Sequence, residues 1–420
     1  MNNECGCNHR VSSLRVVALD MILDEAGKWH FIEINENPIG LAAGDELYSA
    51  SDRSDLGIQN TIDSIVRLLS SRSGLVGLLL PYQFRLTHAK GVKALDMPKF
   101  ASDIPRTLTG LIEDFNAIGV HLTELGTQYS IFDVTNLVGD KPQITTTDGQ
   151  VLSALLKRAP LPHIDIDPSN VLLVNDLRAR LACRNKLLTK ELLRNNKIDG
   201  LVVPPAYRYE PTEDTVGFLQ QCSEESYVVI KPNWGAAGIG VKRLSVKTAL
   251  AELSSLSLTG NCKSKQLLRR ISPPDLMQTA LFGNNLIVEP WIASSEWLIP
   301  GRSSFYCDFR VVVVEGTAVN IHVRRAPAPS RFAKTSHSDL PWLTSLGSIY
   351  PVQLVDRGEV ISERYPIAQE DLKRGLAISE AIVNVLDQSC TSICEGEVKS
   401  ILIQPKQLYG NNPPLIYLNA

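Results

Sequence analysis

The sequence has few cysteines, no long apolar run and no excess of charge of either sign. Eight cysteines among 420 residues are too few for a scaffold held together by disulfides. No apolar run approaches the roughly 20 residues that a membrane-spanning helix needs. Lys and Arg number 42 against 45 Asp and Glu, so the net charge is −3 and a cationic surface for nucleic acid is missing. The sequence therefore predicts partners that are neither nucleic acids nor membranes.

Metal sites built from cysteine or histidine are poorly supported. Cys5 and Cys7 lie close in sequence, but no second Cys or His pair follows at a zinc-like spacing, so two free thiols are favoured. His163, Asp165 and Asp167 form a similar group, for which an ordinary loop with an Asp-Pro step is favoured. The first residues also lack the basic and apolar segments of a secretory signal, and we therefore expect a cytoplasmic protein.

Hydrophobic residues make up 44% of the chain and charged residues 21%, which is typical of a globular protein. Strand-like and helix-like periodicities alternate along the sequence, and they predict an α/β fold. The expected elements are a hairpin of strands 15–23 and 29–34, helix 55–69, strand 75–80, helix 104–118, strand 120–125, a helix that begins near Asn175, strands 227–230, 286–288, 309–314 and 318–323, helix 371–386 and strand 415–418.

A glycine-rich loop follows the strand at 227–230 and Lys231. Gly235, Gly238 and Gly240 leave backbone N–H groups accessible, which suits a polyphosphate. The glycine order matches neither a P-loop nor the dinucleotide fingerprint, so a plain turn between two strands is an equal alternative. Lys231 favours the phosphate interpretation, because a lysine at the end of a strand is a natural phosphate ligand.

Three oxygen-bearing side chains lie on the expected N-terminal hairpin. Asp20 is on the first strand, and Glu33 and Asn35, two residues apart, share one face of the second strand. Two carboxylates and an amide oxygen on one face form a hard, oxygen-only site that suits Mg²⁺. A solvated hairpin face is the common alternative, but the apolar residues around these positions mark the strands as buried.

Two carboxylates flank the end of the strand at 286–288. Glu289 ends the strand, Ile292 lies in the apolar segment that follows, and Glu296 comes next. In this arrangement one carboxylate can meet an amino group and the other a ribose.

Arginines cluster on the expected hairpin of strands 309–314 and 318–323. Arg310 begins the first strand, and Arg324 and Arg325 end the second. Cations that converge from neighbouring strands suit a γ-phosphate or a carboxylate, although adjacent arginines also occur on exposed rims.

Taken together, these residues resemble the ATP-grasp superfamily over the region from about Lys186 to Arg325. The resemblance implies ATP and Mg²⁺ as cofactors, two phosphate lysines, a flexible glycine loop, a hinge that reads adenine and ribose, and a phosphate-contacting arginine. The residues in these roles are, in that order, Lys186 and Lys231; Gly235, Gly238 and Gly240; Glu289, Ile292 and Glu296; and Arg310. Asp20, Glu33 and Asn35 resemble the metal motif of the family, and Arg324 or Arg325 would assist Arg310 at the transferred group.

The order of these motifs departs from the family pattern. The metal motif closes the ATP-grasp domain in the family, whereas here it begins the chain, so the sequence resembles a circularly permuted ATP-grasp protein. Tyr417 and Asn419 near the other end resemble a degenerate copy of the motif. The expected domains are 1–74, the permuted part with the metal motif; 75–174, a pre-ATP-grasp-like α/β domain; 175–288, the small lobe with the glycine loop; and 289–420, the large lobe.

The resemblance implies a ligase that joins a carboxylate to an amine, with both substrates small molecules. Ala18 stands where D-alanine ligases share an arginine, which argues against a D-alanyl substrate. A kinase that phosphorylates a hydroxyl and a nucleotide-binding regulatory protein without catalysis remain as alternatives. The sequence does not determine the oligomeric state, and a homodimer is one option.

Overall fold

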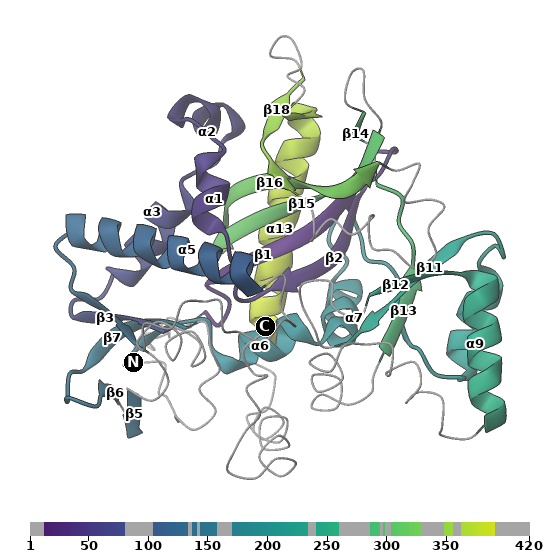
Figure 1. Cartoon of the computed structure of the whole chain (residues 1–420), viewed down its shortest axis with the longest axis horizontal. Coiled ribbons are helices and arrows are strands. Elements are labelled where there is room, and N and C mark those ends of the chain that lie inside the picture. The colour runs from purple at the N-terminus through teal and green to yellow at the C-terminus, as the bar shows by residue number, and fades with distance from the viewer. Residues whose placement is uncertain are drawn as a thin grey trace, which may run out of the picture.

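The fold is a mixed α/β arrangement, shown here by a computed structural model (Figure 1). A large central sheet is flanked by helices on both faces, and two smaller sheets lie at its sides (Figure 1). The structure describes residues 12–79, 104–132, 137–140, 143–157, 170–233, 241–259, 286–294, 297–298, 304–329, 348–355 and 363–390.

The central sheet has seven strands and includes the N-terminal hairpin. Its order is β17 (Ser348–Tyr350), β16 (Thr317–Pro329), β15 (Ser304–Val314), β1 (Val16–Leu23), β2 (Trp29–Asn35) and β9 (Leu201–Val202), with β14 (Trp297–Leu298) beside β15. The expected hairpins, strands 15–23 with 29–34 and strands 309–314 with 318–323, are both confirmed. They are neighbours because β1 pairs antiparallel with β15. The register places Asp20 opposite Glu33 on one side and Arg310 on the other.

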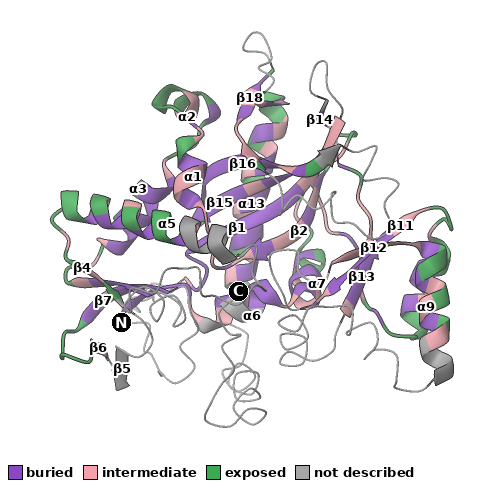
Figure 2. Cartoon of the chain, viewed as in Figure 1, coloured by how far each residue is buried: buried purple, intermediate pink, exposed green. Residues whose placement is uncertain are grey.

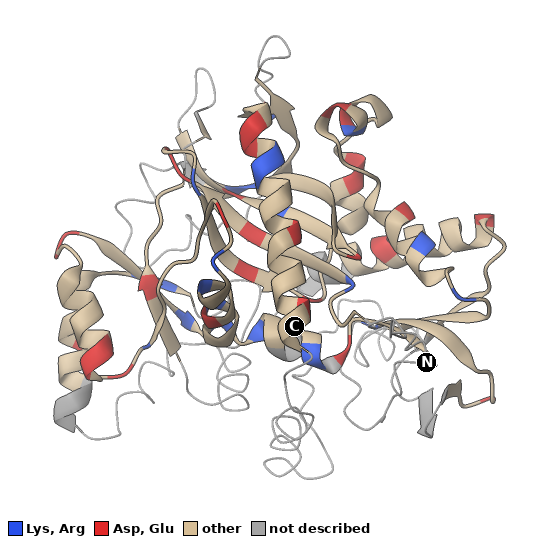
Figure 3. Cartoon of the chain, turned by 180° about the vertical axis from the view of Figure 1, so that it is seen from behind, with Lys and Arg blue, Asp and Glu red and all other residues tan. Residues whose placement is uncertain are grey.

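The two faces of the central sheet pack against different helices. One face, with Leu19, Phe309 and Ile321, packs against α13 (Gln369–Cys390) and α6 (Leu177–Arg184), and α13 crosses this face in Figure 3. The other face, with Ala18 and Val312, shares a core with α1 (Leu41–Glu46), α3 (Thr61–Leu69) and α5 (Ile104–Glu124). Alternate residues of each strand therefore enter separate cores.

A parallel sheet adjoins the second core. Its order is β4 (Tyr129–Phe132), β3 (Leu75–Leu79), β7 (Leu152–Lys157) and β8 (Leu172–Val174), and the hairpin β5 (Leu137–Asp140) with β6 (Gln143–Thr146) lies next to it. Val76, Leu78 and Leu156 share the apolar cluster of α3 and α5, so this sheet packs against the central one through those helices.

A four-stranded sheet on the other side has its own core. Its order is β10 (Tyr207–Arg208), β13 (Leu286–Pro290), β11 (Tyr227–Pro232) and β12 (Lys242–Ser245), covered by α8 (Glu213–Gln221) and α9 (Val246–Thr259). The helix α7 (Lys186–Asn196) lies between this sheet and the central sheet (Figure 1). The short parallel pair β18 (Val352–Leu354) and β19 (Tyr365–Ile367) joins the first core.

Two expectations about helices were wrong in detail. The expected helix 55–69 is two helices, α2 (Ala50–Leu56) and α3, because Gly57 adopts a left-handed φ of 68° that ends α2 and Asn60 caps α3. The expected strand 120–125 is the last part of α5. Val120 is 55% exposed there, so its β-branched side chain lies on the solvent face of a helix and not in a strand. Figure 2 shows the exposed face of α5 in green.

Among the described residues, no helix combines the length and the apolar character that a membrane crossing needs.

Candidate nucleotide and metal site

Asp20 occupies the middle of the central sheet, buried between two arginines. Arg310 donates from Nε and Nη2 to its two oxygens at 2.8 and 2.9 Å, and Arg324 Nη2 lies 2.9 Å from Oδ2. Burial alone would raise the pKa of Asp20, but the charges of the two arginines outweigh burial and hold the pKa well below its ordinary value. The side chain is therefore an anion at every physiological pH.

Arg324 connects Asp20 to a second carboxylate. It donates from Nε and Nη2 to Asp308 at 2.8 and 2.6 Å while it contacts Asp20. Burial would lower the pKa of Arg324, but the charges of Asp20 and Asp308 raise it. Asp308, Arg324, Asp20 and Arg310 form a continuous row of alternating charge across β16, β15 and β1, which we call the sheet row.

The structure does not bring Arg325 into the sheet row. Successive residues of a strand face opposite sides of a sheet, so Arg325 lies on the face away from Arg324. Its guanidinium carbon lies 4.4 Å from the ring centre of Tyr350, 4.6 Å from Phe305 and 5.6 Å from Trp297. Cation–π contacts of this kind stabilise the packing of neighbouring strands, and they place Arg325 apart from the phosphate role expected for it.

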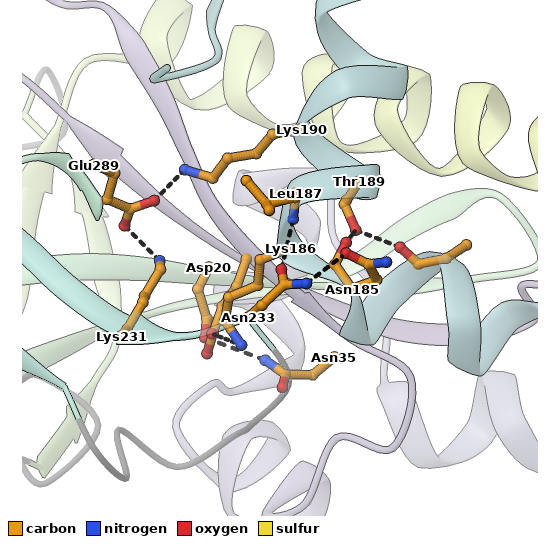
Figure 4. A network of polar contacts seen from close by, with 12 residues as sticks. Asp20, Asn35, Asn185, Lys186, Leu187, Thr189, Lys190, Lys231, Asn233 and Glu289 are labelled. Atoms are coloured by element: carbon orange, nitrogen blue, oxygen red, sulfur yellow. Dashed lines mark hydrogen bonds and ion pairs between the residues drawn. The ribbon is translucent and has the colours of Figure 1, made fainter. Parts of the chain in front are cut away.

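A second charged cluster lies between α7 and the four-stranded sheet. The two oxygens of Glu289 contact Lys190 Nζ at 2.6 Å and Lys231 Nζ at 2.5 Å, as Figure 4 shows. Burial would raise the pKa of Glu289, but the two ammonium groups lower it to about 2. We call Lys186, Lys190, Lys231 and Glu289 the lysine cluster.

Lys190 was missed by the sequence analysis. It follows Lys186 by four residues on α7, and residues at that spacing share one face of a helix. The spacing was therefore an available signal, although it needs the helix face to be known. The side chain of Lys190 is fully buried, with its ammonium on Glu289.

Lys186 joins the lysine cluster to the hairpin. Its Nζ lies 3.7 Å from Glu33 Oε2 on β2. Burial lowers the pKa of Lys186 to about 8, because a charged amine is costly away from water, and Glu33 only partly offsets this. The pKa of Lys190 is lowered to about 8 for the same reason.

An asparagine pair fixes the start of α7 beside the end of β11. Asn233 donates to Asn185 Oδ1 at 2.9 Å and accepts from the backbone N–H of Leu187, also at 2.9 Å (Figure 4). Asn185 in turn caps α7 by accepting from the N–H of Leu188 at 3.2 Å. These contacts hold Lys186 and Lys231 on adjacent elements. The sequence analysis identified neither Asn185 nor Asn233 as part of the site.

The hairpin is fixed in the sheet by Asn175. Its side chain accepts from the N–H groups of Arg15 and Val16 at 2.6 and 3.0 Å, and donates to the carbonyl oxygens of Val16 and Glu36. The carboxylate of Glu36 also pairs with Arg184, directly before α7. Buried polar contacts therefore connect the hairpin to the end of α6, two residues before α7 begins.

Several expected site residues lie outside the described residues. These are Gly235, Gly238, Gly240 and Glu296, together with Cys5, Cys7, His163, Asp165, Asp167, Tyr417 and Asn419. Ile292 is described as a half-buried residue in the segment after β13.

The hairpin residues fit Mg²⁺ by the chemistry of their donors. Asp20 and Glu33 lie opposite each other on β1 and β2, and Asn35 Nδ2 lies 3.3 Å from Asp20 Oδ2. Two carboxylates and an amide oxygen are ligands that Mg²⁺ accepts. No group of three or more His, Cys, Asp or Glu suited to a metal occurs within the described part of the chain, so the third donor here is the amide.

His322 lies beside the sheet row and is uncharged. It is opposite Arg310 in the register of β15 and β16. Burial and the charges of Arg310 and Arg324 lower its pKa to about 3. Its buried Nδ1 has no hydrogen-bond partner among the described residues and faces Gly44 of α1, where a Cβ would lie 3.4 Å away.

No family model and no curated protein matches the sequence. A crystal structure of a protein from Methylobacillus flagellatus KT, assigned as a gamma-glutamylcysteine synthetase, matches with a TM-score of 0.51 over 91% of each chain, at 9% identity. The likeness shows the fold alone. The two proteins share a mixed α/β fold.

Two further solved structures are more distant. D-alanyl-alanine synthetase A from Vibrio cholerae matches with a TM-score of 0.38, at 9% identity, over 74% of this chain and 81% of that one. The D-alanine–D-alanine ligase from Coxiella burnetii matches with a TM-score of 0.28, at 11% identity, over 80% of this chain and all of that one. Likenesses this low carry no argument about the site.

Proposed function

We propose that the protein is an ATP-dependent ligase that joins a carboxylate to an amine. The observation that carries this proposal is the convergence of Lys186 on Glu33, 3.7 Å apart, which joins a lysine cluster suited to polyphosphate to a hairpin suited to Mg²⁺. Residues more than 150 positions apart in the chain meet there. Fold likeness to a gamma-glutamylcysteine synthetase-like protein supports the same reaction class.

The chain's residues bind and orient the reactants. Lys186 and Lys231 hold the α- and β-phosphates, and Arg310 with Arg324 contacts the γ-phosphate or the acyl phosphate oxygens. Asp20, Glu33 and Asn35 would hold a Mg²⁺ ion, which would supply charge neutralisation for the phosphoryl transfer. Glu289 acts differently from the adenine-reading role expected for it: it positions Lys190 and Lys231, since both of its oxygens contact ammonium groups.

The proposed reaction has two balanced steps. A substrate carboxylate oxygen attacks the γ-phosphorus, and the bond from this phosphorus to the β–γ bridging oxygen breaks. ADP leaves, and the substrate becomes an acyl phosphate. The amine then attacks the acyl carbon, loses a proton, and inorganic phosphate leaves as the C–N bond forms. The protein contributes positioning and charge stabilisation, as in other phosphoryl transfers.

Two further proposals concern the order of the segments along the chain and the class of substrate. Circular permutation is supported by the hairpin, which comes first in the chain yet lies inside the central sheet beside β15. A substrate other than a D-alanyl group is supported by Ala18, which is fully buried in the second core and offers no charge.

The test is ADP release, measured against a library of amino acids and other small carboxylates with and without an amine. A ligase releases ADP and phosphate only when both substrates are present, and an amide appears. ADP release with a stable phosphoester and no need of an amine identifies a kinase instead. Nucleotide binding without ADP release under all conditions identifies a regulatory protein.

A further inference from the structure

Both carboxylates proposed as metal ligands are covered by cations of this chain. Asp20 contacts Arg310 and Arg324, and Glu33 contacts Lys186. These cations are the same residues that the proposed function assigns to the phosphates. In the nucleotide-free protein, the side chains proposed to bind phosphate therefore form ion pairs with the side chains proposed to bind the metal.

The two arginines on Asp20 are held very differently. Arg324 has a second carboxylate, Asp308, which it contacts through two hydrogen bonds, and its side chain is 9% exposed. Arg310 is 18% exposed, and Asp20 is the only ion-pair partner of Arg310 among the described residues. Arg324 is thus anchored whether or not Asp20 is available, whereas Arg310 depends on Asp20.

The residue opposite Arg310 on β16 is His322, which is uncharged. Asp308, two residues away on β15, pairs with Arg324. The charge of Arg324, which also contacts Asp20, is of the same sign as that of Arg310. A polyphosphate that enters the site is therefore the strongest new anion within reach of this guanidinium.

We propose that Arg310 is an exchangeable counter-ion: it neutralises Asp20 in the nucleotide-free protein and moves to phosphate when the metal and the nucleotide bind together. The inference rests on the proposed function, because it places the divalent cation at Asp20. Its consequence is positive coupling, in which nucleotide and cation each bind poorly without the other.

The physical reason is competition for the two oxygens of Asp20. Both accept from guanidinium groups, with donor distances of 2.8 to 2.9 Å. A divalent cation cannot bind there without the loss of at least one of these charge-assisted hydrogen bonds and close approach to a like charge. Removal of Arg310 should therefore tighten binding of a free cation by about ten- to a hundredfold.

The test is Mn²⁺ binding to the nucleotide-free full-length protein, followed by electron paramagnetic resonance of the free ion. Arg310→Met is expected to bind Mn²⁺ about ten- to a hundredfold more tightly than the parent. The double variant Asp20→Asn with Arg310→Met is expected to lose that gain, which assigns the ion to Asp20. Arg310→Lys keeps the charge and is expected to remain close to the parent, and circular dichroism checks that each variant is folded.

A second measurement addresses the coupling. The affinity for a non-hydrolysable ATP analogue, measured with and without Mn²⁺, should depend on the ion much more strongly in the parent than in Arg310→Met. Equal Mn²⁺ affinity in the folded parent and Arg310→Met overturns the inference. If the parent still releases ADP, only the inference fails; if the parent binds no nucleotide, the proposed function fails with it.

Discussion

The sheet row and the lysine cluster are both buried and charged, yet they differ in balance. In the sheet row, two guanidiniums face two carboxylates, Asp20 and Asp308, so the charges cancel. In the lysine cluster, Glu289 faces both Lys190 and Lys231, and Lys186 faces Glu33 of β2. Three amines therefore meet two carboxylates, and one positive charge is left over. A buried excess charge is costly and is retained where a ligand supplies the missing one. The lysine cluster therefore keeps a positive charge for an anion, whereas in the nucleotide-free protein the charges of the sheet row are paired within the row.

The largest expected effect is on stability, from a change in the balanced row. Arg324→Met leaves two buried carboxylates with one arginine, and removal of one partner of a buried pair costs about 3–5 kcal/mol. Urea unfolding followed by circular dichroism measures this loss. Arg325→Met is the matched control on the opposite face, and we expect a cost of only about 1 kcal/mol, because cation–π contacts with aromatic rings are replaced by apolar packing. Equal losses would contradict the two-face assignment.

The next effect concerns turnover. Glu33→Gln is expected to lower turnover at least about a hundredfold while nucleotide binding stays measurable, because the metal mainly organises the γ-phosphate for transfer. ADP release and calorimetric titration measure the two quantities. Glu25→Gln, in the exposed turn of the same hairpin, is the matched control and should behave as the parent does. Turnover within about threefold of the parent in Glu33→Gln would make the hairpin purely structural.

Nucleotide affinity should also depend on pH through the lysine cluster. The pKa of Lys186 is lowered to about 8 by burial, so the amine is charged below pH 8 and loses its proton above it. Phosphate prefers the charged amine, so affinity is highest below pH 8 and should fall about tenfold for each further pH unit per lysine titrated. Titration of the non-hydrolysable analogue between pH 7.5 and 9.5 measures this. Lys186→Met should flatten the profile, and an unchanged slope in that variant would assign the pH dependence elsewhere.

The smallest expected effect is on the free energy of unfolding, from a change in the lysine cluster. Lys190→Met leaves Glu289 paired with Lys231 at 2.5 Å and removes the unbalanced charge, so the free energy of unfolding should change by less than about 1 kcal/mol. Urea unfolding beside Arg324→Met gives the direct contrast. A loss of about 3 kcal/mol or more would show that the lysine cluster is as tightly balanced as the sheet row.

Much of the candidate site could be predicted because its residues stand at the ends of recognisable elements. The alternation in the expected strands 15–23 and 29–34 predicts that Asp20, Glu33 and Asn35 share one face, and the register of the structure places Asp20 opposite Glu33. Lys231 and Glu289 end strands of one sheet and meet there. Such placements depend on local periodicity, which the sequence contains.

Other features depended on information from outside each segment. Lys190 gains its role only once α7 faces Glu289, and the Asn185–Asn233 pair joins elements 48 residues apart. The choice between Arg324 and Arg325 was open to sequence reasoning, because Ile321 and Val323 alternate with Arg324 and lie on the same face as Arg325. The false strand at 120–125 arose because Val120 is β-branched, whereas its position on the solvent face of α5 is set by tertiary packing.

The most direct test of the central claim is nucleotide binding to a variant of the lysine cluster. Titration calorimetry with a non-hydrolysable ATP analogue and Mg²⁺ would compare the parent, Lys231→Ala and the control Lys247→Ala, which alters an exposed lysine on α9. The account predicts a ten- to hundredfold loss of affinity for Lys231→Ala, about 1.5–3 kcal/mol, and none for Lys247→Ala. Unchanged affinity in a folded Lys231→Ala variant would contradict it.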